Sequence, residues 1–125
     1  MKTIIAGSRV GVTLEDVRRA VKNCPWNITC IVSGGAIGVD QFGEVIAKEN
    51  DLPIEQYLIS QEDWETYGRG AGHVRNRKMA ENAQALIAIW DGKSKGTENM
   101  IKEAGRCSLP TFVIIVGGNT LEDFC

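Results

Sequence analysis

Three segments of the chain combine glycine with hydroxyl or charged side chains, and each follows an apolar run. Glycine permits positive φ angles and lets another group approach the backbone closely. Where such a segment opens a helix, the free N–H groups and the positive end of the helix dipole favour an anion. Arg9, Lys93 and Lys95 add positive charge, although the chain has a formal charge of −2. These features predict a phosphate site. In chain order the segments hold Gly7, Ser8 and Arg9; Ser33, Gly34, Gly35, Ala36, Gly38 and Asp40; and Asp91, Gly92, Lys93, Ser94, Lys95, Gly96 and Thr97.

Two common nucleotide fingerprints do not fit these segments. In "SGGAIGVD" the GxGxxG pattern has Ser33 in place of its first glycine. The stretch "GKSKGT" lacks the GK[ST] ending of a P-loop. The sequence therefore supports neither a dinucleotide fingerprint nor a P-loop ATPase.

Arg75 and Met79 are four residues apart in "GHVRNRKMAENA", so they share a helical face. If Met79 is buried, Arg75 points inward near the start of this helix, where it suits a bidentate contact to phosphate or carboxylate. A structural ion pair is the alternative for Arg75. Asn76 is expected either to bind a ligand amide or to cap the helix. His73 is expected in the preceding loop, solvated or acting in acid–base chemistry.

Aromatic side chains lie near the same region of the chain. Trp64 and Tyr67 are candidates for stacking on a nucleobase. Trp90 is expected to pack against a neighbouring layer or subunit instead.

The pattern of elements explains how these residues meet. Apolar, β-branched runs predict strands, and apolar residues at helical spacing predict helices between them. This alternation predicts a doubly wound α/β fold, a five-stranded parallel sheet in the order 3-2-1-4-5 with helices on both faces. Ligands bind such sheets at the carboxyl ends of the strands where the order reverses, here between the first and fourth strands. The strands are predicted at 3–6, 28–32, 53–59, 85–90 and 110–116, the helices at 13–21, after Gly38, at 73–83 and at 97–107, and a polar loop at 60–72.

Single glycine-rich turns between strand and helix are common and often purely structural. Three of them at one sheet edge, each with a hydroxyl or a cation, favour a ligand site. The predicted ligand-binding residues are Gly7, Ser8, Arg9, Ser33, Gly34, Gly35, Ala36, Gly38, Asp40, Arg75, Asn76, Asp91, Gly92, Ser94, Gly96 and Thr97.

The composition limits the class of protein. The 125 residues suit a single domain, with a core at 1–116 and a tail at 117–125. The net charge of −2 and the pI near 5.4 argue against a nucleic-acid partner. No apolar run approaches the roughly 20 residues of a membrane span, so no membrane partner is expected. The opening residues are typical of a strand rather than a signal peptide.

The cysteines indicate a reduced, cytoplasmic protein. None of the four forms a CxxC pair, and His73 is the only histidine, so we expect no metal site. No cofactor is expected apart from a nucleotide as ligand.

The segments "IIAGSR", "IVSGGAIGVD" and "DWETYGRGAGHVRNRKMAENAQALIAIWDGKSKGT" resemble the YspA/YpsA-related branch of the SLOG superfamily. The resemblance runs from Lys2 to Val116. It implies a Rossmann-like domain that binds nucleotides or nucleotide-derived ligands and senses or processes nucleotide signals. It also implies a homodimer or larger homo-oligomer, for which Trp26, Trp64 and Phe124 offer apolar area.

The chain is more distantly similar to the Lonely Guy phosphoribohydrolases, which cleave the N-glycosidic bond of nucleoside monophosphates. In this resemblance Arg75 matches the catalytic arginine, and Gly96 and Thr97 match the GT of a PGGxGTxxE motif. Met100 stands at the position of the motif's glutamate. Glu98 lies two residues earlier, about 200° away around the helix, so it is no simple substitute.

Two functions from different classes follow. In the first, the protein binds a nucleotide signal in order to sense or sequester it. Backbone N–H groups of the glycine segments would then hold the phosphate, Arg9 and Arg75 would neutralise it, and Asp40 or Asp91 would accept from ribose hydroxyls. In the second, the protein is a nucleotide N-glycosidase that releases free base, and Asp91, Asp40 or Glu98 stabilises the ribosyl cation. A purely structural or oligomeric module is a third option.

Overall fold

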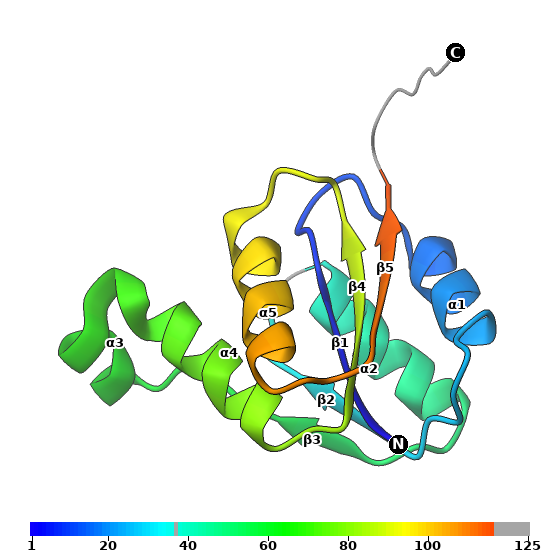
Figure 1. Cartoon of the computed structure of the whole chain (residues 1–125), viewed down its shortest axis with the longest axis horizontal. Helices are drawn as coiled ribbons and strands as arrows, with labels where there is room; N and C mark the ends of the chain where they lie inside the picture. The colour runs from blue at the N-terminus through cyan, green and yellow to red at the C-terminus, as the bar shows by residue number, and fades with distance from the viewer. Residues whose placement is uncertain (37, 117–125) are drawn as a thin grey trace.

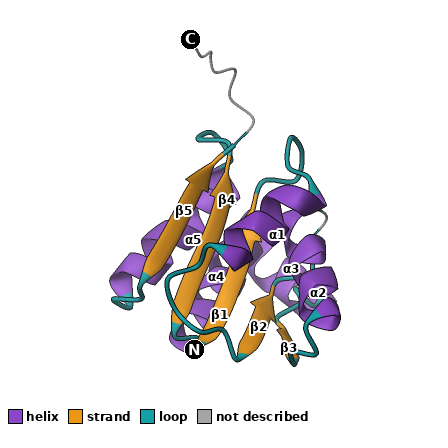
Figure 2. Cartoon of the chain, turned by 90° about the vertical axis from the view of Figure 1, so that its right-hand side faces the viewer, coloured by secondary structure: helices purple, strands orange, loops and turns teal. Residues whose placement is uncertain are grey.

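The computed structural model describes residues 1–36 and 38–116, and its centre is a parallel sheet with helices on both faces (Figures 1 and 2). The strand order is β3-β2-β1-β4-β5, and all four pairings are parallel, which confirms the predicted fold class and order. The elements are β1 (Lys2–Gly7), α1 (Leu14–Lys22), β2 (Cys30–Ser33), α2 (Val39–Glu49), β3 (Ile54–Gln56), α3 (Gln61–Tyr67), the 3₁₀ helix η1 (Gly68–Gly70), α4 (Ala71–Glu81), β4 (Ala85–Trp90), α5 (Lys95–Arg106) and β5 (Thr111–Ile115).

The two central strands, β1 and β4, separate two apolar cores. Successive side chains of a strand point to opposite faces of the sheet. Ile4 and Leu86 therefore join the core under α4 and α5, which also holds Met79 and Met100. Their neighbours Ile5 and Ile87 join the other core, with residues of α1 and α2. Because both faces are covered, β1 and β4 are continuous apolar runs.

The helix that follows β1 begins where the sequence predicts. Thr13 is the N-cap of α1 and accepts a hydrogen bond from the Asp16 amide at 3.1 Å, while the Asp16 carboxylate accepts from the Thr13 amide at 2.9 Å. This capping box fixes the start of the helix. Val17 and Ala20 are buried, so they hold α1 on the sheet.

The segment 60–72 is the main difference from the prediction. It is not a loop: it forms α3 and η1 and leads directly into α4. Ser60 and Asp63 form a capping box that starts α3. Residues 61–70, here called the α3 arm, contain no buried residue and project from the sheet beyond α4 (Figure 1).

Two further boundaries differ. Because α4 begins at Ala71, Arg75 lies in its second turn rather than at its start. The third strand covers only Ile54–Gln56, because its partner β2 ends at Ser33, which is paired with Gln56. No helix in the described part of the chain has the length and apolar character needed to cross a membrane.

The residues expected to supply an interface have different environments. Trp26 packs against the core between the sheet and α1 and α2, and its indole donates to Thr3 Oγ1 at 3.1 Å. Trp64 on the α3 arm is 51% exposed. Phe124 and the predicted tail lie outside the described residues. Cys24, Cys30 and Cys107 are free thiols.

Candidate functional site

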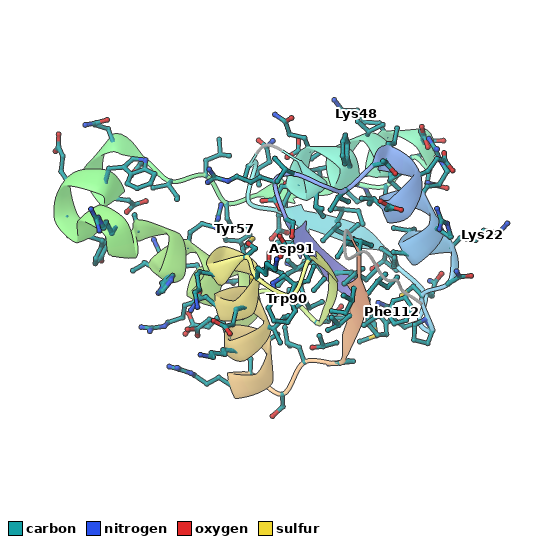
Figure 3. All side chains as sticks on the ribbon, turned by 90° about the horizontal axis from the view of Figure 1, so that it is seen from above. Lys22, Lys48, Tyr57, Trp90, Asp91 and Phe112 are labelled. Atoms are coloured by element: carbon teal, nitrogen blue, oxygen red, sulfur yellow. The ribbon has the colours of Figure 1, made fainter. Side chains whose placement is uncertain are left out.

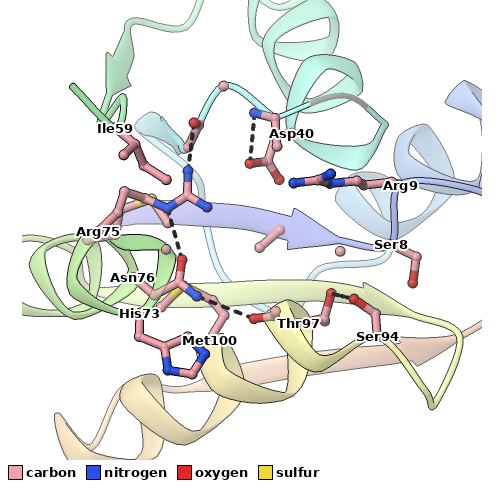
Figure 4. A pocket seen from close by; sticks show the side chains of 18 of the residues that line it. Ser8, Arg9, Asp40, Ile59, His73, Arg75, Asn76, Ser94, Thr97 and Met100 are labelled. Atoms are coloured by element: carbon pink, nitrogen blue, oxygen red, sulfur yellow. Dashed lines mark hydrogen bonds between the residues drawn. The ribbon is translucent and has the colours of Figure 1, made fainter. Parts of the chain in front are cut away.

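A cleft of about 820 Å³ opens at the carboxyl edge of the sheet (Figure 4). The loops after β1 and β4 meet there, beside the loop after β2 and the inner face of α4. Figure 3 looks down on this edge, with Trp90 and Asp91 near its centre. The predicted site residues that line the cleft are Gly7, Ser8, Arg9, Gly34, Gly35, Ala36, Asp40, Arg75, Asn76, Asp91, Ser94, Gly96 and Thr97. Ser33, Gly38, Gly92 and Glu98 are not among the residues that line it.

The amides of the β2–α2 loop are largely occupied by the protein itself. The Gly35 amide donates to Ser33 Oγ at 3.0 Å, and the Ala36 amide donates to the Asp40 carboxylate at 3.3 Å. The Val39 amide at the start of α2 donates to the Ser8 carbonyl at 3.4 Å. The prediction that the Gly35 amide holds phosphate stays a prediction, and it would require this amide to exchange Ser33 Oγ for a phosphate oxygen.

The glycines of this loop make room for other parts of the protein. A Cβ on Gly34 would collide with the guanidinium group of Arg75, and one on Gly35 would collide with Leu58. Gly38 has a φ of 92° and lies against the backbone of Arg9, with 2.8 Å between the position of a Cβ and the Arg9 Cα. Gly38 thus shapes the loop, and its predicted contact with a ligand stays a prediction.

The hydroxyl of Ser33 forms hydrogen bonds that stabilise the same loop. It donates to the Glu44 carboxylate at 2.7 Å and accepts from the Gly35 amide. Ser33 is fully buried, and its predicted role as a ligand contact stays a prediction.

The first turn of α5 has free donors. Within the described residues, the amides of Lys95, Gly96 and Thr97 have no hydrogen-bond acceptor, whereas the Glu98 amide donates to the Ser94 carbonyl. A Cβ added to Gly96 would meet no atom within 4 Å, so the space beside Gly96 is open. Such a helix start attracts an anion through its N–H groups and its dipole.

Asp91 organises the loop before α5. Its Oδ1 accepts from the amides of Lys93 and Ser94, both at 2.8 Å, and its own amide donates to Ser8 Oγ at 3.1 Å. The hydrogen bonds from Ser94 and Lys93 lower the pKa of this carboxyl, which keeps it ionised. The Trp90 indole also donates to the Ser94 carbonyl at 3.1 Å, so Trp90 supports the same turn.

Arg75 points into the cleft, as its spacing from the buried Met79 predicts. Its Nη1 donates to the Gly34 carbonyl at 2.7 Å, and its Nε donates to Asn76 Oδ1 at 3.0 Å (Figure 4). Both acceptors are neutral oxygens. The guanidinium group therefore keeps its charge available at the cleft, although burial lowers its pKa from the usual value.

Asp40 is a carboxyl group at the bottom of the cleft, only 6% exposed. Burial raises its pKa to about 6, and the nearby charge of Arg75 and the Ala36 amide only partly oppose this rise. At neutral pH this group stays close to its titration range, as a proton-transferring carboxyl group would.

Several residues that line the cleft are not among the predicted ligand-binding residues. Leu58 and Ile59 follow β3 in the structure, but the sequence predicts a strand over 53–59, so the strand-end rule applied to that strand does not find them. Arg69 belongs to the α3 arm, and its position follows from a helix that the sequence interpretation did not include. Of the predicted stacking residues, Trp64 lines the cleft and Tyr67 does not. His73 lines the cleft and is exposed.

The chain is 30% identical over 118 residues to the Gene 61 protein of Mycobacterium phage D29, and the match spans 87% of this chain and 92% of that protein. Neither a family model nor a solved structure matches the chain.

Proposed function

The chain belongs to the same family as the Gene 61 protein of Mycobacterium phage D29, and we propose that it binds a nucleotide or nucleotide-derived signal in the cleft at the carboxyl edge of its sheet. The observation that carries this proposal is the first turn of α5, where the amides of Lys95, Gly96 and Thr97 have no acceptor among the described residues and the space beside Gly96 is open. In the proposal, the protein senses or sequesters the ligand.

The phosphate is placed at this turn because its donors converge there. The Lys95, Gly96 and Thr97 amides would surround the phosphate oxygens. Arg75 is linked to the same turn through Asn76, whose Nδ2 donates to the Gly96 carbonyl at 3.3 Å. A guanidinium group held in this way suits a phosphate, because its planar N–H groups match two oxygens at once.

The nucleobase is placed toward the α3 arm. Leu58, Ile59 and Trp64 line that side of the cleft, and Leu58 and Trp64 are 61% and 51% exposed. Large apolar groups at a cleft rim favour an aromatic ligand group, which would cover them. Asp40, between the two ends, would accept a hydrogen bond from a ribose hydroxyl.

The test is a panel of nucleotides incubated with stoichiometric protein, filtered, and analysed by chromatography. We expect the protein to deplete one intact nucleotide, which is recovered on denaturation. Gly96→Val should abolish this depletion, because its side chain would fill the open space at the α5 turn. Gly105→Val is the matched control, since Gly105 lies in the same helix with equally open surroundings, away from the cleft. A panel that yields no depletion and no product would contradict the proposal and favour a structural or oligomeric module.

A second function is favoured by one observation, the buried Asp40. A nucleotide N-glycosidase needs a carboxyl group beside the ribosyl carbon. Met100 is 1% exposed, Glu98 does not line the cleft, and the Asp91 carboxylate already accepts from two amides. Asp40 is therefore the group that would stabilise the cation. In this case free base appears over time, and Asp40→Asn abolishes turnover while the nucleotide still binds.

We also propose that the protein is a cytoplasmic member of the SLOG superfamily and forms a homodimer or larger homo-oligomer. The exposed Leu58, Trp64 and Tyr67 support the oligomer, because they gather near the unburied α3 arm. Sedimentation velocity should give at least twice the 13.7 kDa of the chain. A monomer at tens of micromolar protein would refute the oligomer and leave the ligand proposal intact.

A further inference from the structure

Asn76 connects the two groups to which the phosphate is assigned, and we infer that it is a positioning residue that joins Arg75 and the first turn of α5 into one anion-binding unit. The inference rests on the proposed function for its ligand. It replaces the expectation that Asn76 binds a ligand amide or caps a helix, since Asn76 lies in the middle of α4.

The evidence is that every polar atom of this side chain is used within the protein. Asn76 is 5% exposed. Its Oδ1 accepts from Arg75 Nε at 3.0 Å, and its Nδ2 donates to the Gly96 carbonyl at 3.3 Å and to Asn99 Oδ1 at 2.9 Å. An amide nitrogen has two N–H groups, so neither is left for a ligand. Asn76 therefore acts through its neighbours.

The chemistry of the amide group explains why asparagine suits this position. Arg75 Nε is a donor and requires an acceptor, whereas the Gly96 carbonyl is an acceptor and requires a donor. A carboxylate supplies only acceptors, and an aliphatic side chain supplies neither. The Gly96 carbonyl fixes the orientation, because it can only accept and so keeps the amide nitrogen toward α5 and the oxygen toward Arg75.

The resulting chain of hydrogen bonds crosses the cleft. It runs from the Gly34 carbonyl in the β2–α2 loop through Arg75 and Asn76 to Gly96 at the start of α5. An arginine that is fixed before a ligand arrives loses less rotamer entropy on binding than a free arginine does. The Nη2 atom, which makes none of these bonds, is left for the anion.

The experiment is a two-dimensional NMR titration of ¹⁵N-labelled protein with inorganic phosphate, and separately with nucleoside 5′-monophosphates. The variants are Asn76→Ala, Asn76→Asp and the control Asn82→Ala. Asn82 is the C-cap residue of α4, and its side chain donates to the Lys78 carbonyl at 2.8 Å. In the wild type, phosphate should shift the Gly96 and Thr97 amides, and the Arg75 Nε–H should exchange slowly with water.

Asn76→Ala should weaken phosphate binding about tenfold, because Arg75 loses a charge-assisted hydrogen bond and its fixed orientation. Its Arg75 Nε–H should exchange at least tenfold faster. Asn76→Asp should also weaken phosphate binding, since it brings a negative charge and loses the donor to Gly96, yet its Arg75 Nε–H should stay protected. Asn82→Ala should behave as the wild type. A purely structural role for Asn76 would not separate these two variants at Arg75.

Wild-type affinity together with a protected Arg75 Nε–H in Asn76→Ala would overturn the inference, and so would a wild type without phosphate-dependent shifts at Gly96 and Thr97. If Asn76→Ala does not fold, the phosphate affinity of Asn76→Asp is the test. A wild-type affinity in that variant would overturn the inference. Phosphate binding at the α5 turn with no nucleotide bound would refute the proposed function and leave the inference standing. If the wild type and Asn76→Ala bind a nucleotide equally well, the inference is refuted and the proposed function stands.

Discussion

Gly34 and Gly35 lack side chains at two points where other side chains of the protein pass. Arg75 occupies the space beside Gly34, and Leu58 occupies the space beside Gly35. Both of these neighbours line the cleft. The two glycines therefore contribute to the site indirectly, because their lack of a side chain lets Arg75 and Leu58 approach the loop.

Gly34→Ala should displace Arg75 and weaken phosphate binding by at least tenfold. The new Cβ would lie 2.7 Å from Arg75 Cζ and 2.9 Å from Asp40 Oδ2, so the guanidinium group must move. Crowding of this kind costs about 1–3 kcal/mol of stability. Gly35→Ala is the comparison: its φ of 74° and its contact with Leu58 also cost stability, but Arg75 stays in place. Urea denaturation and phosphate titration separate the two, and unchanged phosphate affinity in Gly34→Ala would contradict the assignment of Arg75.

The sequence predicts where these residues gather but not what each one contacts. The position of Arg75 follows from its spacing to Met79. The structure agrees, because Met79 is buried and Arg75 lines the cleft. The partners of the Gly35 amide and of the Ser33 hydroxyl depend on loop dihedrals and rotamers. Periodicity and composition carry no information about those angles, so the sequence alone does not show that these donors have acceptors within the protein.

Among the elements, the α3 arm is the one that the apolar pattern does not reveal. Helices are found from sequence by their buried face, and no residue of α3 or η1 is buried. The signal that remains is the capping pair, Ser60 and Asp63, which fits the S-x-x-D form of a helix start. The two helices therefore separate capping from packing, because α3 has a capping box without a buried face and α1 has both.

Removing a cap should have different consequences in α1 and in α3. Thr13→Ala and Ser60→Ala each remove a side-chain acceptor that caps a helix, at a local cost of about 1 kcal/mol. In α1 the cost should lower the global free energy of unfolding, because Val17 and Ala20 fix that helix to the core. In α3 it should only increase local fraying.

The measurements are urea denaturation and limited proteolysis of both variants. Ser60→Ala should keep the wild-type midpoint and be cleaved faster within 60–70, whereas Thr13→Ala should show a lower midpoint. A lower midpoint in Ser60→Ala would mean that the α3 arm is part of the cooperative core.

At the scale of the whole molecule, the topology brings distant segments together. Ser8 and Asp91 are 83 residues apart in sequence and are joined by a hydrogen bond, because β1 and β4 are parallel neighbours. The strand order follows from the alternation of strands and helices, so the sequence predicts this meeting. The link from Arg75 through Asn76 to Gly96 depends on the packing of α4 on α5, which the order of elements does not determine.

The unfolding free energy of the whole protein should depend on pH through the ionisation of Asp40. Its pKa rises from 3.8 to about 6 on folding, mainly through burial, while Arg75 and Arg9 lower it and Glu44 raises it. Between about pH 4 and pH 6 the folded state therefore holds a proton that the unfolded state has released. The unfolding free energy falls as pH rises through this window, and the loss is complete above it.

Asp40→Asn should remove this loss, because an amide does not ionise. At about 1.4 kcal/mol for each pKa unit, the variant should be more stable than the wild type by up to about 3 kcal/mol near pH 8 and by little near pH 4. Urea denaturation of both proteins across this range gives the difference directly, because the other titrating groups are common to both. If Asp40→Asn is more stable than the wild type, the ionised Asp40 carboxylate destabilises the folded protein. A residue that lowers stability in this way is expected to contribute to ligand binding instead. A constant difference across the range would mean that Asp40 titrates alike in the folded and unfolded states, so that its burial would not destabilise the folded protein through its charge.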